Sequence, residues 1–313
     1  MSEMQTNRFA AGAAYVDGVF KPMAEAVIPV NDFGYRRSDV TYDVVGVWEG
    51  NFFRLDDHIA RFRNSMNALR LQPPESNDTI KDILHKLVRL TGLRSAYVAM
   101  DCLRGVPVPG KPRHPANARN YLVAYAVPWI SIVTEEQYER GVHMIIARTL
   151  RIPPESFDPR VKNFHWGDLT AGLFEALDQG ADTAVLLDTD GNVTEGPGFN
   201  VFSITDGVVA TPIRGGLDGM TRQSVFELCG ELGIPCVARA VPAEELRQAD
   251  EIFTCTTAGG IMPVSRIDGR IMGNDRPGVI SSKLKDLFWA RRAEGWHATP
   301  VNYDAPVEET AGA

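Results

Sequence analysis

The sequence predicts a protein of the α+β class built from two domains, and three observations support this prediction. The chain has 313 residues, which is enough for two cores of ordinary size. Short apolar segments bounded by Asp-Gly or other Gly-containing turns occur in both halves, together with longer segments of helical periodicity. The stretch 128–136 interrupts these patterns. We therefore expect a smaller N-terminal domain over residues 1–127, a linker over 128–137 and a larger C-terminal domain over 138–313.

The composition is that of a soluble globular protein whose partner is a small molecule. Hydrophobic residues make up 44% of the chain and charged residues 23%. The formal net charge of −8 argues against binding to nucleic acid or to an anionic membrane. The four cysteines form no C-x-x-C pair and no metal-ligand spacing with the six histidines. Since no apolar leader or membrane-length run is visible either, we expect free thiols, no metal site and a cytoplasmic location.

Turn residues separate the first elements of the N-terminal half. Asp17-Gly18 predicts a tight hairpin, and Glu49-Gly50-Asn51 predicts a second one between strands 41–48 and 52–55. A helix follows, with Asp56 as its expected N-cap. Its apolar stripe consists of Ile59, Phe62, Met66 and Leu69. Arg61 lies off that stripe, so it is available for a role other than packing.

A Pro- and Gly-rich loop interrupts the rest of this half. A second helix is expected over 78–90, and strands are expected over 96–104 and 120–127. Between these strands, Gly105–Pro115 contains too many Pro and Gly residues for regular structure. Long loops of this kind are usually functional, so we expect this rim loop to border the active site.

The C-terminal half shows the same alternation of strands, turns and helices. A helix over 166–179 is stopped by Gly180, a helix over 221–232 ends at Gly233, and a last helix covers about 278–292. The expected strands are 142–148, 183–187, 199–204 and 251–255, and the expected hairpin turns are Asp190-Gly191, Asp206-Gly207 and Asp268-Gly269.

Lys162 is the candidate nucleophile. It lies in the stretch Phe157–Gly172, just ahead of the helix expected over 166–179. A lysine whose pKa is lowered by burial or by neighbouring cations can form a Schiff base with a carbonyl compound or with pyridoxal phosphate. Most of the 32 Lys and Arg residues of such a chain are surface charges, so this interpretation depends on the motifs that accompany Lys162.

Glu195 is a candidate partner for such a cofactor. It lies in the turn Thr194–Asn200, where glycines allow close packing between two expected strands. A carboxylate beside the pyridine nitrogen of pyridoxal phosphate keeps that nitrogen protonated, which makes the ring an electron sink. The alternative is an ordinary solvent-facing turn residue.

Two further loops have the composition of a phosphate site. Gly215–Arg222 leads a Gly-rich loop into a helix start, where backbone N–H groups and the helix dipole favour an anion. Thr256–Gly260 adds two hydroxyls and accessible amides after a strand. Arg61 could supply a charge-assisted contact to the same phosphate.

Two other kinds of site are not predicted. Gly105–Pro112 fits G-x-x-x-x-G-K, but Pro112 replaces the required Ser or Thr and two internal prolines remove N–H groups, so a nucleotide P-loop is excluded. The six histidines show no H-E-x-x-H motif, and no G-x-S-x-G motif accompanies them.

Taken together, these motifs resemble the fold-type IV pyridoxal-phosphate transaminases, which include branched-chain and D-amino acid aminotransferases and (R)-selective amine transaminases. The likeness extends over nearly the whole chain and is greatest to the (R)-amine branch. It implies a smaller N-terminal α/β domain and a larger, mixed α/β C-terminal domain that resembles a barrel. The motifs that carry it are Ser38–Val44, Phe53–His58, Phe157–Pro159, Val161–Leu169, Thr194–Asn200, Met220–Arg222 and Cys255–Gly260.

The resemblance also implies a role for each candidate residue. Lys162 would form the Schiff base with pyridoxal 5'-phosphate and transfer the proton between substrate and cofactor, and Glu195 would pair with the pyridine nitrogen. The phosphate would be held by Arg61, Met220, Thr221 and Thr257, with Thr256 beside them. Tyr42, Trp166 and the turn at Thr257-Ala258 would line the substrate pocket. Members of the family are dimers whose site is completed by a partner loop, so a homodimer is implied.

Three residues depart from the pattern of the (R)-amine branch. Arg37 stands where that branch usually has a histidine, and Gly110 stands near the place of a rim-loop arginine, with Lys111 and Arg113 just after it. Asp101 occupies a strand position where an apolar residue is expected. Arg37 either binds a substrate α-carboxylate in bidentate fashion, which would favour amino acids over plain amines, or is a surface residue.

The predicted function is transamination by a ping-pong mechanism. An (R)-amine or a D-amino acid would donate its amino group to a 2-oxo acid such as pyruvate or 2-oxoglutarate. A branched-chain L-amino acid is the alternative donor. A lyase similar to aminodeoxychorismate lyase, or a non-catalytic binding protein with the same fold, would explain fewer of the motifs.

Overall fold

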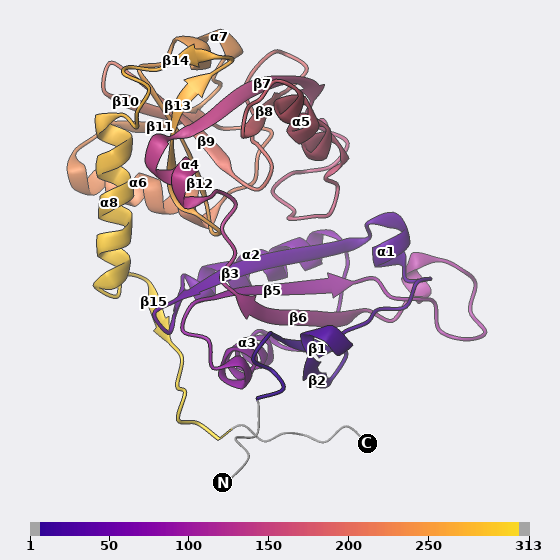
Figure 1. Cartoon of the computed structure of the whole chain (residues 1–313). Helices are drawn as coiled ribbons and strands as arrows, with labels where there is room; N and C mark the ends of the chain where they lie inside the picture. Colours follow the sequence, from indigo (N-terminus) through magenta and orange to yellow (C-terminus); the bar gives the residue numbers. More distant parts are fainter. Residues whose placement is uncertain (1–6, 307–313) are drawn as a thin grey trace. The chain divides into compact units, whose positions relative to one another are not determined.

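The computed structural model describes residues 7–306, and the chain forms two compact units (Figure 1). Unit 1 comprises Met1–Ile130, Val161–Phe164 and Gly295–Ala313, and unit 2 comprises Ser131–Arg160 and His165–Glu294. The chain thus returns to unit 1 for four residues around Lys162 and again at its C-terminal end. The domain ranges expected from the sequence divide the chain continuously and do not include these returns.

Unit 1 is built on a seven-stranded sheet in which every neighbouring pair is antiparallel. Both central residues of the turn Asp17-Gly18 have positive φ (48° and 93°), as a two-residue hairpin turn requires, so the predicted hairpin is confirmed. In spatial order the strands are β15 (Ala298–Pro300), β4 (Asn51–Phe53), β3 (Val40–Trp48), β5 (Ala96–Leu103), β6 (Tyr121–Pro128), β1 (Ala13–Val16) and β2 (Val19–Pro22).

Two amphipathic helices, α2 (Leu55–Ala68) and α3 (Asn77–Thr91), pack against this sheet and against each other. Side chains alternate along β5, so Val98 and Met100 point into the core that the helices share, and Asp101 points to the opposite face. The other helical segments of unit 1 are α1 (Phe33–Arg37) and two 3₁₀ turns, Met23–Glu25 and Pro115–Asn117.

The start of α2 differs from the prediction. Its N-cap is Arg54, in the left-handed conformation (φ 55°, ψ 39°), and not Asp56. The Nε atom of Arg54 donates to Asp57 at 2.8 Å. Asp56 and Asp57 both lie in the first turn, where negative charge interacts favourably with the helix dipole. Because acidic residues are favourable at both positions, the sequence pattern could not separate an N-cap from a first turn.

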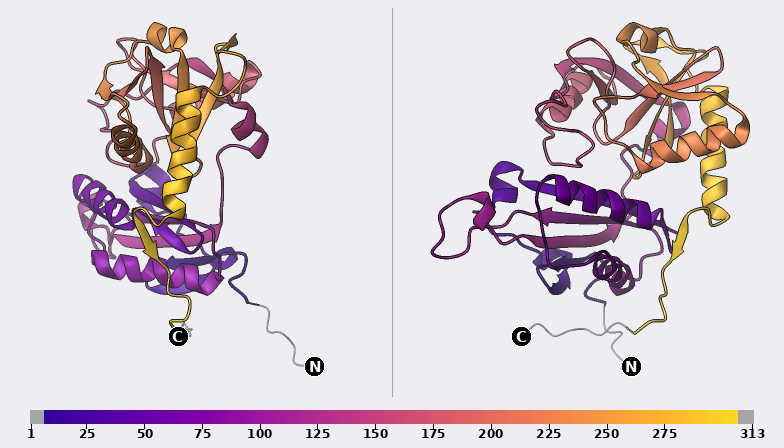
Figure 2. Two further views of the ribbon diagram at one scale, coloured as in Figure 1. Left: turned by 90° about the vertical axis from the view of Figure 1, so that its left-hand side faces the viewer. Right: turned by 180° about the vertical axis from the view of Figure 1, so that it is seen from behind.

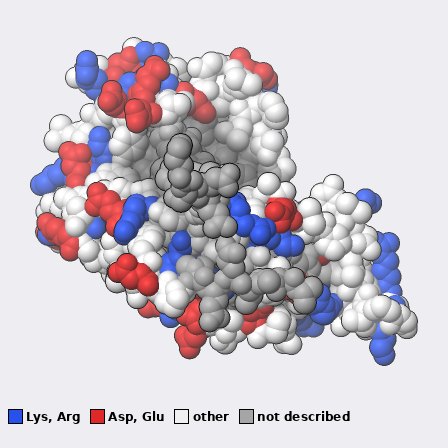
Figure 3. All heavy atoms as spheres, turned by 60° about the horizontal axis from the view of Figure 1, so that its bottom comes forward, with Lys and Arg blue, Asp and Glu red and all other residues white. Residues whose placement is uncertain are grey.

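The rim loop between β5 and β6 is irregular, as predicted. Its regular features are the turn Pro115–Asn117 and an isolated bridge between Pro107 and Ala118. The loop extends away from the strands that it joins (Figure 2). Figure 3 shows basic side chains and no acidic ones at the projecting end of unit 1, and the sequence of the loop supplies Lys111 and Arg113.

Unit 2 is built on a mixed sheet in which β7 pairs in parallel with β8 and β13, and β10 with β11, while the other pairs are antiparallel. The spatial order is β11 (Cys236–Arg239), β10 (Val208–Pro212), β9 (Asn200–Thr205), β12 (Glu251–Thr256), β13 (Gly260–Ile267), β7 (Val142–Leu150) and β8 (Thr183–Leu187), with β14 (Arg270–Ile271) beside β13. The helices are α4 (Glu135–Arg140), α5 (Gly167–Asp178), α6 (Met220–Leu232), α7 (Ala243–Gln248) and α8 (Val279–Ala293). Figure 2 shows α8 running along this unit, where it packs on β12, β13 and α6.

Three short elements of unit 2 were not predicted. Helix α4 lies in the range expected to be a linker and is started by a capping box of Thr134 and Gln137. Strand β11 and helix α7 lie in a stretch for which the sequence analysis predicts no element. These elements have four to six residues each, too few to show a period of apolar residues.

Within residues 7–306, no helix is long and apolar enough to cross a membrane. The same part of the chain contains no cluster of side chains suited to hold a metal ion. Its four cysteines are free thiols.

Candidate active site

Lys162 is fixed to unit 1 by its backbone. Its carbonyl oxygen accepts hydrogen bonds from the Thr41 hydroxyl (2.6 Å) and from the Tyr42 amide (3.3 Å), both on β3. Its own amide donates to the Ser65 hydroxyl of α2 at 3.2 Å. The side-chain Nζ atom lies 4.2 Å from the centroid of the Tyr42 ring, where the electron-rich face attracts a cation. The candidate nucleophile therefore lies against the Tyr42 ring.

Arg61 belongs to a buried group of charges on the opposite face of β3. Its Nε and one terminal nitrogen each donate to the Asp43 carboxylate at 2.8 Å. The Nδ1 atom of His58 donates to the same carboxylate at 2.8 Å, and both His58 and Asp43 are fully buried. Burial raises the pKa of Asp43, but the charge of Arg61 and the hydrogen bonds from Arg61 and His58 outweigh it and hold this pKa well below its usual range. Arg61 is thus oriented by a partner that the sequence analysis did not identify.

Burial lowers the pKa of His58, and the charges of Arg61 and Lys162 act in the same direction against the attraction of Asp43. With its proton on Nδ1, its Nε2 atom is buried and has no hydrogen-bond partner among the described residues.

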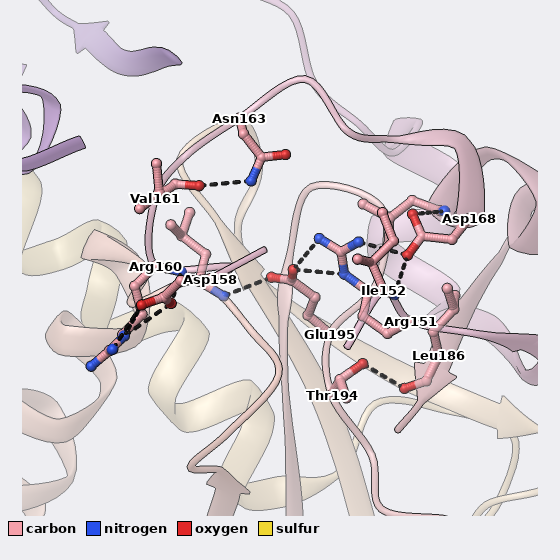
Figure 4. A network of polar contacts seen from close by, with 12 residues as sticks. Arg151, Ile152, Asp158, Arg160, Val161, Asn163, Asp168, Leu186, Thr194 and Glu195 are labelled. Atoms are coloured by element: carbon pink, nitrogen blue, oxygen red, sulfur yellow. Dashed lines mark hydrogen bonds and ion pairs between the residues drawn. The ribbon is translucent and has the colours of Figure 1, made fainter. Parts of the chain in front are cut away.

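In unit 2, the Glu195 carboxylate is held by three N–H groups (Figure 4). Arg151 donates to its Oε1 atom from Nε at 3.2 Å and from a terminal nitrogen at 3.1 Å, and the Leu217 amide donates to Oε2 at 2.8 Å. The other terminal nitrogen of Arg151 donates to Asp168 at 2.6 Å. Arg151 and Glu195 are each 7% exposed, so little water screens this ion pair. Glu195 is therefore a fixed carboxylate and not the solvent-facing turn residue of the alternative interpretation.

Sequence reasoning missed Arg151, Asp168, Asp43 and His58. The only signal for Arg151 is a basic residue between the strand predicted over 142–148 and the Lys162 loop. Its partner Glu195 lies 44 residues further along, so the ion pair appears only in the folded chain.

The turn Thr194–Asn200, which contains Glu195, contacts the loop around Leu217 and the end of strand β12. Asn200 begins β9 and pairs with Cys255 near the end of β12, and its side-chain amide donates to the Leu217 carbonyl at 2.8 Å. Gly215 has a φ of +81°, and a Cβ there would lie 2.5 Å from a methyl carbon of Thr194. The glycines of the predicted phosphate loop are therefore required by positive φ and by close packing against the Glu195 turn.

The start of α6 has the properties of a phosphate site. The N-cap is Gly219, and no side chain caps the helix. Met220 and Thr221, its first residues, are buried, and its first turn contains no acidic residue. Uncapped N–H groups at the positive end of a helix dipole favour a bound anion. Phosphate therefore suits this end of the helix.

The remaining candidates of unit 2 lie at loop ends. Trp166 directly precedes α5, and its ring lies 3.4 Å from where a Cβ of Gly198 would be. The Thr256 hydroxyl accepts a hydrogen bond from the Ala258 amide at 3.5 Å, and Thr257 lies between them, half-buried. Ala258 is buried, and its carbonyl accepts from the Ile132 amide at 3.0 Å.

Arg37 lies at the surface of unit 1. It is the last residue of α1 and is exposed, and its guanidinium carbon lies 4.2 Å from the centroid of the Phe33 ring. The guanidinium carbon of Arg113 in the rim loop lies 5.4 Å from the centroid of the same ring. Neither arginine forms an ion pair within residues 7–306, so this part of unit 1 offers two basic groups to an anion.

The fold and these residues define a class of enzyme that uses a lysine amine together with a cofactor bearing a phosphate and a pyridine nitrogen. The chain belongs to the class IV amino-transferase family, whose model matches residues 41–267. Pyridoxal 5'-phosphate is the cofactor of this class, and the uncapped helix and the fixed carboxylate of unit 2 suit its phosphate and its ring nitrogen.

Known proteins of this family are similar over most of the chain. A branched-chain-amino-acid aminotransferase of Pseudomonas aeruginosa is 31% identical over 239 residues, which are 76% of this chain and 77% of that protein. A D-alanine aminotransferase of Bacillus licheniformis is 30% identical over 271 residues, or 86% of this chain and 93% of that protein. The solved branched-chain amino acid aminotransferase from Thermobaculum terrenum in its PLP form has a TM-score of 0.82 at 27% identity, covering 93% of this chain and 98% of that one. The predicted family, the α+β fold of type IV and the cofactor are confirmed.

Proposed function

We propose that this aminotransferase takes its amino group from an (R)-amine or a D-amino acid and transfers it to a 2-oxo acid such as pyruvate. The observation that carries the preference for an amine is the face of the unit 1 sheet beside Lys162. None of the strand residues on this face of β3, β5 and β6 is Lys, Arg or His, and Asp101 adds a carboxylate to it. A donor with an α-carboxylate needs a cation there, whereas an amine without one does not.

Each candidate residue has a separate role in this proposal. When bound, pyridoxal phosphate supplies the electron sink that lets a substrate carbon lose its proton. Lys162 would hold the cofactor through Nζ, and the same atom would carry the proton from the substrate carbon to the cofactor. Glu195, kept anionic by Arg151 and the Leu217 amide, holds a proton on the ring nitrogen. The start of α6, Thr257 and Arg61 bind the phosphate.

Branched-chain L-amino acids are the second candidate donors. The names of the relatives from Pseudomonas aeruginosa and Thermobaculum terrenum favour them. The guanidinium groups of Arg37 and Arg113 at Phe33 favour a carboxylate as well, although the 2-oxo acid acceptor could use them equally.

The donor is tested by the absorption of the holoenzyme without acceptor. (R)-1-phenylethylamine, its (S) enantiomer, D-alanine and L-leucine are added separately. The proposal expects the long-wavelength cofactor band to disappear with the (R)-amine and not with the (S)-amine. Loss of the band with L-leucine alone would make the enzyme a branched-chain aminotransferase. A reaction that releases pyruvate without any 2-oxo acid acceptor would instead indicate the lyase.

We also propose that the protein works as a homodimer in the cytoplasm. Helix α5 supports the dimer, because Leu173, Phe174 and Leu177 on it are 38%, 62% and 67% exposed. Large apolar side chains grouped in this way commonly mark a protein interface. Light scattering during size-exclusion chromatography should give twice the chain mass of 34.4 kDa.

A further inference from the structure

Asp101 lies among tyrosines on the face of the unit 1 sheet that bears Tyr42. It is paired directly across from Tyr42 on β3 and from Val123 on β6. Residues directly opposite in an antiparallel pair have their Cβ atoms about 5 Å apart on one face. Tyr97 and Tyr125 belong to the same face, with ring centroids 6.3 Å apart and nearly parallel rings. We call these four half-buried residues, Tyr42, Tyr97, Asp101 and Tyr125, the tyrosine-aspartate cluster.

The carboxylate of Asp101 forms no hydrogen bond and no ion pair within residues 7–306, although it is half-buried. Two fully buried aspartates of unit 1, Asp32 and Asp43, do have hydrogen-bond partners. Asp32 accepts from the Gly34 amide at 2.6 Å and from the Tyr121 hydroxyl at 2.8 Å, and Asp43 is paired with Arg61. An Asp that served the fold alone would be satisfied in the same way, because leaving a half-buried carboxylate unpaired costs free energy.

The pKa shifts of Asp101 and Tyr125 agree with an unpaired Asp101 carboxylate among the tyrosines. Loss of hydration raises the pKa of Asp101 to about 7, and no nearby cation opposes that rise. Burial raises the pKa of Tyr125 to about 12, and the negative charge of Asp101 contributes to that rise. Asp101 therefore lies close enough to the cluster tyrosines for its charge to act on them, and it gains free energy from any cation brought to the cluster.

The tyrosine rings around Asp101 also favour a cation as the ligand. A cation is attracted to the face of a tyrosine ring, and the Lys162 Nζ atom already occupies such a position on Tyr42. Because one ring, that of Tyr42, contacts the reactive amine and lies across from Asp101, a ligand that reaches Lys162 from this face passes beside the carboxylate.

We propose that the tyrosine-aspartate cluster binds a second ammonium group on the amino donor, so that the preferred donors are diamines or similar amines with a distal positive charge. The Asp101 carboxylate pairs with the distal ammonium, the tyrosine rings surround it, and the other amino group is left for transfer. This inference rests on the proposed aminotransferase function and names the class of its donor. It also explains why a carboxylate occupies a strand position where an apolar residue was expected.

The test compares two amines without stereocentres on the holoenzyme in the absence of acceptor. They are 1,5-diaminopentane and hexylamine, which differ mainly in a terminal ammonium or methyl group. Rates of loss of the cofactor band are measured at about pH 8.5, where Asp101 is ionised and both amines are largely protonated. The variants are Asp101→Asn, which keeps the shape and removes the charge, and Asp78→Asn, an equal change at an exposed position of α3.

The wild-type enzyme should react at least about tenfold faster with the diamine at low concentration, and Asp101→Asn should abolish that preference while hexylamine reacts as before. Asp78→Asn should behave as wild type. Asp101→Asn should also melt at the same or a higher temperature, since it removes an unpaired half-buried charge; a lower melting temperature with an unchanged preference would show a purely structural Asp101 and overturn the proposal.

Equal rates of the two amines with the wild-type enzyme would overturn this inference and leave the aminotransferase intact. A wild-type holoenzyme whose cofactor band is unchanged by every amine and amino acid would instead overturn the proposed function itself.

Discussion

At the scale of single residues, candidate site side chains are positioned by charged partners that are distant in sequence. Glu195 is held by Arg151, and Arg61 is held by Asp43 beside His58. Lys162 and Glu195 can be proposed from the sequence because each lies in a local motif. Their neighbours Arg151 and Asp43 cannot, because single positions show no signal for an ion pair that forms only after folding.

Replacement of Lys162 by Ala removes the amine that we propose to bind the cofactor and to move the substrate proton. Turnover should fall by about 10⁴-fold or more. The thermal melt of the apoenzyme should change little, since the Lys162 backbone makes the contacts to Thr41 and Ser65. Steady-state rates and a melting curve check both points, and a variant that kept even a tenth of wild-type turnover would refute the role of Lys162.

Replacement of Arg151 by Met leaves two buried carboxylates, Glu195 and Asp168, without their shared cation. The free energy of unfolding should fall by about 3–5 kcal/mol, because an unpaired buried charge remains. Without this cation beside the Glu195 carboxylate, the cofactor should hold its own proton more tightly, so the pH profile of the cofactor absorption should move to higher pH.

Arg148→Met is the matched control for this prediction. Arg148 lies on the same strand β7, but its side chain is 91% exposed. Its replacement should change the unfolding free energy by less than about 1 kcal/mol. Equal effects of the two substitutions would contradict a special role for the Arg151–Glu195 pair.

The buried pair of Asp43 and His58 should make the fold sensitive to acid. Both groups have a pKa in the folded protein below that in the unfolded chain, so the stability that they contribute is present at higher pH and is lost as pH falls. For His58 the loss begins below its ordinary pKa of 6.5, with a slope of up to about 1.4 kcal/mol per pH unit.

Unfolding by urea at pH 7.5 and 5.5 measures this slope. The difference between the two pH values should be smaller in His58→Gln than in the wild-type protein. His114→Gln, at an exposed position of the rim loop, should keep the wild-type difference. An unchanged slope in His58→Gln would show that His58 does not titrate on unfolding.

At the scale of elements, the proposed phosphate site is a loop and a helix start, and local sequence predicts both. Gly215–Arg222 was read as a Gly-rich loop entering a helix, and the structure places the first residue of α6 at Met220, one residue earlier than predicted. Asp-Gly hairpins were predictable for the same reason, since a two-residue turn with positive φ has few possible sequences. Short elements such as α4 and α7 were not, because six residues show no complete amphipathic pattern.

Gly215→Ala tests the packing of this loop, with Gly191→Ala as its control. Both glycines have a φ of +81°, but a Cβ at Gly191 meets no atom within 4 Å, whereas one at Gly215 would lie 2.5 Å from Thr194. Gly191→Ala should therefore cost only the backbone strain, about 1 kcal/mol. Gly215→Ala should cost more and should also weaken cofactor binding, measured by equilibrium dialysis. If Gly215→Ala and Gly191→Ala lost the same stability and cofactor affinity were unchanged, close packing of Gly215 against Thr194 would be contradicted.

At the scale of the whole molecule, the chain returns to unit 1 at Val161–Phe164, the segment that contains the candidate nucleophile Lys162. Residues 161–164 leave unit 2 so that Lys162 joins β3 and α2, elements formed about a hundred residues earlier in the chain. The sequence placed Lys162 in the C-terminal domain, since composition and periodicity follow the chain and do not reveal a short return. The overall class was predictable because hairpin and helix signals recur in both halves. The assignment of Lys162 to unit 1 depends on contacts between residues more than 100 positions apart in the sequence, such as the hydrogen bond from Thr41 to Lys162.

The central claim is that Lys162 carries the cofactor, and trapping of the holoenzyme tests it most directly. Borohydride reduction fixes the bond between a lysine and pyridoxal phosphate, and peptide mass spectrometry then locates the modified residue. We predict one modified peptide, containing Lys162, whose label is lost when an amine donor is added before reduction. Label on a different lysine, or label that a donor does not remove, would contradict the claim.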